Sequence, residues 1–118
     1  MAGFDQMYEM AAALRAFPAI ARPGLVDALG ETIDEAVRIA RAKAPVRTGF
    51  LRSSIHGEPV VVRGQWGLLG HLTADAPYAT FVEYGTSRMA PQPFLEPAAE
   101  QAMNEFPGKI DAVLEMLP

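Results

Sequence analysis

Two histidines, His56 and His71, are the most chemically versatile side chains of this 118-residue chain, and both fall in segments that alternate like β-strands. Together with Glu83 they would form a small set of metal ligands or acid–base groups. No spacing fixes a third ligand, and isolated histidines of this kind are typical of half-exposed strand positions. We therefore expect no metal site.

Ser53 and Ser54 lie just before His56, which raises the possibility of a nucleophile and its base. Successive strand residues point to opposite faces, so Ser54 and His56 share only an orientation. The chain contains no Gly-x-Ser-x-Gly, no His-Glu-x-x-His and no glycine-rich phosphate loop. We expect no catalytic residue and no cofactor. A small hydrolase using Ser54, His56 and His71 is kept only as an alternative.

Composition narrows the function classes further. Half of the residues are hydrophobic and 20% are charged, which is typical of one globular domain over residues 1–118. The absence of cysteine excludes disulfides and thiolate metal sites. A net charge of −4 argues against a wide phosphate-gripping face. We also expect no membrane span and no signal peptide, because the chain lacks the apolar runs that these require.

The elements that would position these residues indicate an α+β fold. Apolar spacing predicts an N-terminal helix over about 4–20 and a long helix over about 25–44, which Pro45 ends. Alternation predicts a small antiparallel sheet over about 50–73 with a turn at Gly64-Gln65, packed by the long helix. Pro59 marks a break or an edge bulge in its first strand.

Two further helices complete the prediction. A short helix over about 77–84 has Asp75 as its N-cap and ends at Gly85. We expect Tyr78 and Phe81 to hold it on the sheet. Residues 86–93 read as an exposed loop or an edge strand, and a helix over about 95–116 is kinked at Pro107-Gly108.

Three motifs follow one another along the chain: AKAPVRTGFLRSSI at 42–55, APYATFVEYGT at 76–86 and MAPQPFLEPA at 89–98. In order and spacing they resemble the tail-completion, or minor tail component, family of long-tailed bacteriophages, the head–tail joining type named after gene product ten of coliphage HK ninety-seven. The residues that carry this structural pattern are Pro45, Thr48, Gly49, Tyr78, Glu83, Gly85, Thr86 and Phe94.

The resemblance implies a virion protein, made in the bacterial cytoplasm, that forms a six-fold ring in the phage neck. Such a ring completes the tail and joins it to the head connector. Its implied partners are further copies of itself and the head-closure, tail-terminator and tail-tube proteins. Double-stranded DNA would pass through the axial channel without specific binding. The alternatives are a tail terminator or head-closure protein of the same neck, or a non-viral interaction module of prophage origin.

Physical reasoning adds candidate residues for contacts between subunits. A segment stiffened by prolines loses little entropy on docking, so we expect residues 88–93 to contact another subunit. Arginines around the end of the long helix would pair with Glu83, Glu96 or Glu100 of a neighbour, away from the channel. Glu83 is open to a second role, as a hydrogen-bond acceptor within its own chain. The candidates are Arg38, Arg41, Arg47, Arg52, Leu69, Glu83, Arg88, Met89, Pro91, Gln92 and Pro93.

Overall fold

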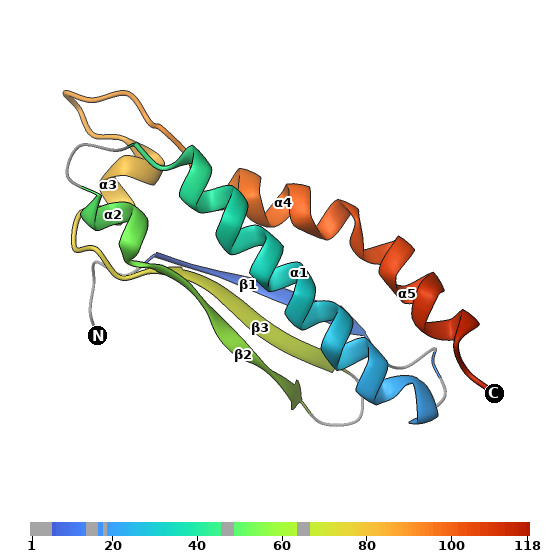
Figure 1. Ribbon diagram of the computed structural model, residues 1–118. Helices are drawn as coiled ribbons and strands as arrows, with labels where there is room; N and C mark the ends of the chain where they lie inside the picture. Colours follow the sequence, from blue (N-terminus) through green and yellow to red (C-terminus); the bar gives the residue numbers. More distant parts are fainter. Residues whose placement is uncertain (1–5, 14–16, 18, 46–48, 64–66) are drawn as a thin grey trace.

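The computed structural model describes residues 6–13, 17, 19–45, 49–63 and 67–118, with the backbone alone for 6–13 and 59–63. Its described elements are β1 (Gln6–Ala13), η1 (Ala19–Ala21), α1 (Arg22–Lys43), α2 (Phe50–Ser53), β2 (Ile55–Arg63), β3 (Gly67–Ala74), α3 (Ala79–Tyr84), α4 (Glu96–Asn104) and α5 (Phe106–Glu115) (Figure 1). The α+β class is confirmed. The predicted turn at Gly64-Gln65 lies outside the described residues.

The described strands form one antiparallel sheet in the order β1-β3-β2. The register places Ile55 of β2 opposite Ala74 of β3, and it shifts between Glu58 and Val61. This shift brackets Pro59, which has no N–H to donate, so the predicted irregularity in an edge strand is confirmed.

The predicted N-terminal helix is wrong, because residues 6–13 form β1 and pair with β3 from Gln6↔Ala74 to Ala13↔Gly67. Glu, Met and Ala all favour helices in isolation. The open edge of β3 supplies backbone partners along the whole segment, and this pairing outweighs the local preference.

The first strand within the predicted range of about 50–73 begins later in the chain than that range does. Residues Phe50–Ser53 form the single helical turn α2, and β2 begins at Ile55. Gly49 precedes this turn with φ of 81°, a left-handed conformation that glycine adopts without strain. The apparent alternation of Leu51, Ser53 and Ile55 therefore arises across two different elements.

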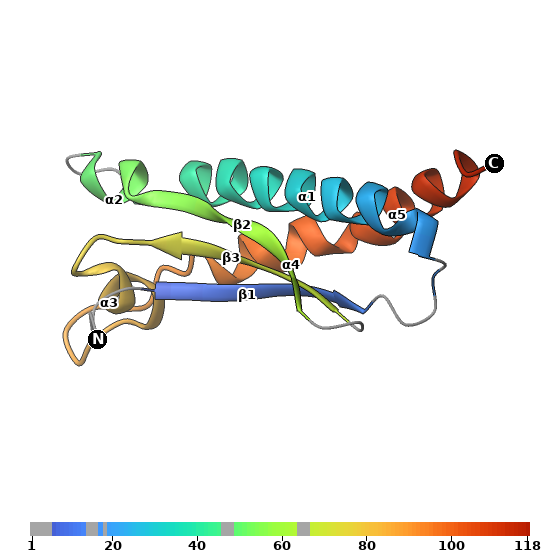
Figure 2. The ribbon, with the colours of Figure 1, turned by 90° about the horizontal axis from the view of Figure 1, so that it is seen from below.

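The helices cover one face of the sheet. The apolar stripe of α1 packs on β2 and β3, while α4 runs beside α1 and reaches β1 (Figures 1 and 2). Leu29, Ile33 and Leu72 are almost fully buried where these layers meet. The prediction that the long helix packs across the sheet is confirmed.

The C-terminal helical region is divided, as Pro107 predicted. Helix α4 ends at Asn104 and α5 begins at Phe106, with Pro107 in the first turn of α5, where a missing N–H costs nothing. Together they run back along α1, so the molecule is elongated, with extents of 55 × 27 × 21 Å. None of the described helices is long and apolar enough to span a bilayer.

Candidate functional site

His56, Ser53 and Ser54, which the sequence offered as catalytic candidates, contact nearby groups of their own chain. His56 Nε2 lies 2.7 Å from Asp75 Oδ2, and its Nδ1 lies 3.8 Å from Glu58 Oε1. The hydroxyls of Ser53 and Ser54 each donate to a carbonyl of the α2 turn, at 3.0 and 2.8 Å. Neither serine therefore pairs with a base in this arrangement.

Glu83 belongs to a different region from the histidines. It lies on α3, and its side chain is buried against the start of α4. Among the described residues, no group of three or more His, Asp or Glu side chains is suited to a metal. Asp75 contacts His56 and does not cap α3, which begins at Ala79 without a side-chain cap.

Three consecutive backbone N–H groups converge on the Glu83 carboxylate. Its Oε1 accepts from Phe94 at 2.9 Å and from Leu95 at 3.0 Å, and its Oε2 accepts from Glu96 at 3.0 Å. These donors begin α4, where a helix leaves N–H groups unsatisfied and where negative charge is stabilised. Of the two roles that the sequence left open, this geometry favours the one within the chain.

The Gly85-Thr86 motif turns the chain away from α3. Gly85 has φ of 78°, and a Cβ there would lie 2.8 Å from the Met89 carbonyl oxygen. Thr86 N–H donates to that same oxygen at 2.8 Å, and Thr86 Oγ1 accepts from Arg88 N–H at 3.2 Å. Gln92 N–H then donates to Val82 O at 2.8 Å, which returns the loop to α3. The motif shapes the 85–93 loop.

Two arginines of the predicted cluster fasten the junction between α1 and β2. Arg41 Nη2 donates to Ile55 O at 2.8 Å, and Arg52 Nε donates to Arg41 O at 3.1 Å. Arg38 pairs with Glu35, one turn away on α1. Arg47 and Thr48 lie outside the described residues. These contacts account for Arg41 and Arg52 without a second subunit.

The remaining candidates differ in exposure. Arg88, Met89, Pro91, Gln92 and Pro93 are exposed on the 85–93 loop, as predicted for an exposed segment. Leu69 is only 8% exposed, so its surface is covered within its own chain. Phe94, one of the motif residues, is fully buried in the core.

An apolar groove lies beside this loop, between α2 and α3. We call it the aromatic groove; it has a volume of about 670 Å³ and is lined chiefly by Phe50, Leu51, Tyr78, Phe81, Val82 and Met89. The rings of Phe50 and Tyr78 stand 6.1 Å apart at 49°. The expectation that Tyr78 and Phe81 hold α3 on the sheet is wrong, because they are 39% and 46% exposed and Ala79 is the buried apolar residue.

Sequence reasoning missed this groove, although one signal was present. The i, i+3, i+4 spacing of Tyr78, Phe81 and Val82 defines one apolar face of α3 but not what that face meets. In the structure that face opens outward. Exposed apolar patches of this kind mark sites of contact with other molecules.

Fold and site together define a small α+β structure with an exposed aromatic groove beside the 85–93 loop. Residues 9–85, well over half of the chain, match the family model described as "Bacteriophage HK97-gp10, putative tail-component". The chain belongs to this family, which confirms the resemblance. The match begins within β1, extends just past the end of α3 and stops before the Met89–Ala98 motif. Searches of curated proteins and of solved structures found no match.

Proposed function

We propose that this chain is a non-enzymatic structural subunit of the phage neck, where copies form a ring that completes the tail and joins it to the head connector. Membership of a family of phage tail components is the observation that carries the proposal. The exposed aromatic groove and the 85–93 loop support it, because a building part needs surfaces for its neighbours.

In this proposal DNA crosses the axial channel without being held. The net charge of −4 supports this view, since phosphate-gripping surfaces depend on dense cationic side chains. We propose that the arginines near the end of α1 face neighbouring subunits and not the lumen. Because Arg41 and Arg52 bond to the backbone of their own chain and Arg38 pairs with Glu35, the exposed Arg88 is the better candidate for a contact with an acidic group of another subunit.

Deletion of the gene from the phage or prophage that encodes it tests the proposal. We expect filled heads and tails of normal length that fail to join, with joining restored by the chain supplied in trans. Overlong tails would identify a tail terminator, and heads that leak DNA would identify a head-closure protein. Joined, infectious particles in the deletion lysate would overturn a role in the neck.

A blot of purified particles for the tagged chain provides the second measurement. The chain should be present in joined particles and at the head-proximal end of isolated tails by immunolabelling. Its absence from both would contradict the proposal and favour a non-viral interaction module.

A further inference from the structure

The exposed large hydrophobic side chains of the described residues gather at the two ends of the elongated molecule. Phe50, Tyr78, Phe81, Tyr84 and Met89 lie at the end formed by α2, α3 and the 85–93 loop. Ile20 and Met116 lie at the opposite end, where α1 begins and α5 finishes (Figure 1). Among the residues whose side chains the structure describes, which exclude 6–13 and 59–63, none of these large exposed side chains lies on the long sides.

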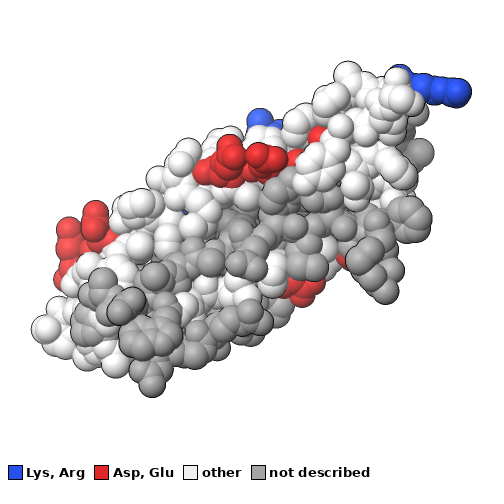
Figure 3. All heavy atoms as spheres, turned by 180° about the vertical axis from the view of Figure 1, so that it is seen from behind, with Lys and Arg blue, Asp and Glu red and all other residues white. Residues whose placement is uncertain are grey.

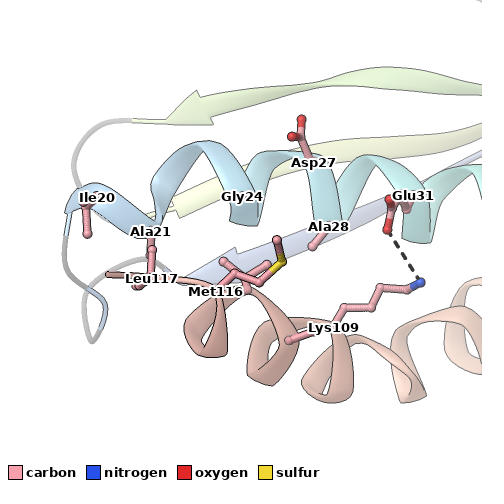
Figure 4. Close-up of a pocket in the computed structure, with 11 residues that line it drawn as sticks. Ile20, Ala21, Gly24, Asp27, Ala28, Glu31, Lys109, Met116 and Leu117 are labelled. Atoms are coloured by element: carbon pink, nitrogen blue, oxygen red, sulfur yellow. Dashed lines mark ion pairs between the residues drawn. The ribbon is translucent and has the colours of Figure 1, made fainter.

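The second end is hollowed. We call it the α1–α5 hollow, a depression of about 420 Å³ between the first turns of α1 and the last turns of α5 (Figure 4). Ile20 is 60% exposed and Met116 is 86% exposed at its rim. Asp27 and Glu31 also line it, and Lys109 Nζ reaches Glu31 Oε2 at 4.0 Å.

The two ends carry opposite charge. Around the aromatic groove, Lys43, Arg52 and Arg88 are exposed, whereas the nearby carboxylates of Asp75 and Glu83 already accept hydrogen bonds from His56 and from the start of α4. The opposite end exposes the carboxylates of Asp27, Glu31, Asp111 and Glu115. Figure 3 shows a basic side chain extending from the loop end, acidic side chains at the other end, and further acidic side chains along the side between them.

We propose that the aromatic groove and the 85–93 loop of one copy dock on the α1–α5 hollow of the next copy. Met116 and Ile20 of the second copy then meet the aromatic groove, and Arg88 of the first approaches Asp27 and Glu31. The inference rests on the proposed function, because it assigns the contact that builds the ring.

Charge and symmetry favour this head-to-tail pairing over a like-with-like contact. Pairing two loop ends would bring Arg88 toward Arg88, and pairing two hollows would bring carboxylates together, both of which are repulsive. A contact between two different surfaces leaves the hollow of the first copy and the groove of the second copy open, so the contact can repeat. Repeated contacts of this kind form a ring where the rotation between copies closes, and the proposed ring requires that closure.

The small area of the proposed contact indicates whether it is stable in the purified protein or only in the assembled particle. The two shorter extents of the molecule are 27 and 21 Å, so a contact between two ends covers a narrow cross-section. Typical stable complexes bury roughly 800 Å² on each partner, which is more than a cross-section of this size offers in projection. We therefore expect the purified chain to be monomeric and the contact to persist only where the tail holds the copies together. The test must use assembled particles.

Engineered cysteines test the contact, since the chain has none of its own. Particles carrying Met89→Cys with Met116→Cys are treated with a short bismaleimide and run on a denaturing gel. The expected result is loss of monomer into a ladder of dimers, trimers and larger species. Each single variant should stay monomeric, and a mixture of the two single variants should stop at dimers.

Met89→Cys combined with Gln101→Cys is the matched control, because Gln101 is exposed on the side of the molecule, on α4. It should give no ladder. Gln92→Cys with Ile20→Cys provides an independent pair if the first variant fails to enter particles. Absence of a ladder in both pairs, or dimers from Met116→Cys alone, overturns the inference while the chain's presence in particles upholds the proposed function. Its absence from unmodified particles overturns the proposed function itself.

Discussion

Glu83 and Phe94 are joined by a buried hydrogen bond, in which the Phe94 N–H donates to Glu83 Oε1 at 2.9 Å. The bond links the second and third sequence motifs across the exposed 85–93 loop. Two further N–H groups share the same carboxylate, so one side chain fixes both the end of α3 and the start of α4. The loop is thereby held at its two ends while its tip remains on the surface.

Glu83→Ala should lower the free energy of unfolding by about 3 kcal/mol or more, because it leaves three N–H groups at a buried helix start without their acceptor. Glu83→Gln should lose less, since its amide oxygen still accepts from two of them. Urea unfolding measures both variants. Glu100→Ala, a change at an exposed position of α4, is the control and should be nearly neutral. Equal midpoints for Glu83→Ala and the control would refute this account.

Gly57 packs against α1 and Gly30 lies within α1, and replacing each by alanine should change stability in opposite directions. A Cβ at Gly57 would lie 2.5 Å from Ile33 Cγ2, so Gly57→Ala should cost about 1–3 kcal/mol through overpacking. Gly30 lies inside α1 with nothing within 4 Å, so Gly30→Ala should add about 0.5–1 kcal/mol of stability. Thermal melts of the two variants should shift in opposite directions. A stabilised Gly57→Ala would show that β2 does not approach α1 this closely.

The two described glycines with positive φ should also differ. Gly49→Ala carries only a backbone cost of about 1–2 kcal/mol, because nothing lies within 4 Å of its Cβ position. Gly85→Ala adds a contact of 2.7 Å with Pro91 N and should be clearly more destabilising. Chemical denaturation ranks the pair. A smaller loss at Gly85 than at Gly49 would contradict the turn geometry described for the 85–93 loop.

The burial of the apolar stripe of α1 predicts a larger loss of stability on substitution at Ile33 than at Val37. This residue is 3% exposed between α1 and the sheet, so Ile33→Ala should lower the free energy of unfolding by about 2–5 kcal/mol. Val37, half-buried on the same stripe, should lose less as alanine. Guanidinium unfolding of the two variants checks the order, and an equal, small loss at both positions would mean that α1 does not pack on the sheet.

The arginines of the α1–β2 junction should separate by their partners. Arg41→Ala removes a bond to Ile55 O and should cost about 1 kcal/mol. Arg38→Ala removes only an exposed pair with Glu35 and should be within about 0.5 kcal/mol of the parent chain. Circular dichroism during urea unfolding distinguishes them. Should Arg38→Ala be the more damaging change, the junction is not held as described.

The sequence by itself determined the long helix, its place on a small sheet, the short helix over about 77–84 and the family. These features are local or periodic: the stripe of Leu29, Ile33 and Val37 repeats at helical steps, and Pro45 and Gly85 end elements through their own backbone chemistry. The break at Pro59 and the division at Pro107 follow from the same missing N–H.

Only the tertiary structure decided the rest. Residues 6–13 became a strand because β3, some 60 positions later, offers a free edge, and no local pattern contains that partner. Glu83 could equally have faced another subunit until the start of α4 was seen to fold back onto it. Tyr78 and Phe81 had the same apolar spacing whether they met a core or solvent. Spacing defines a face, but long-range packing decides what that face touches.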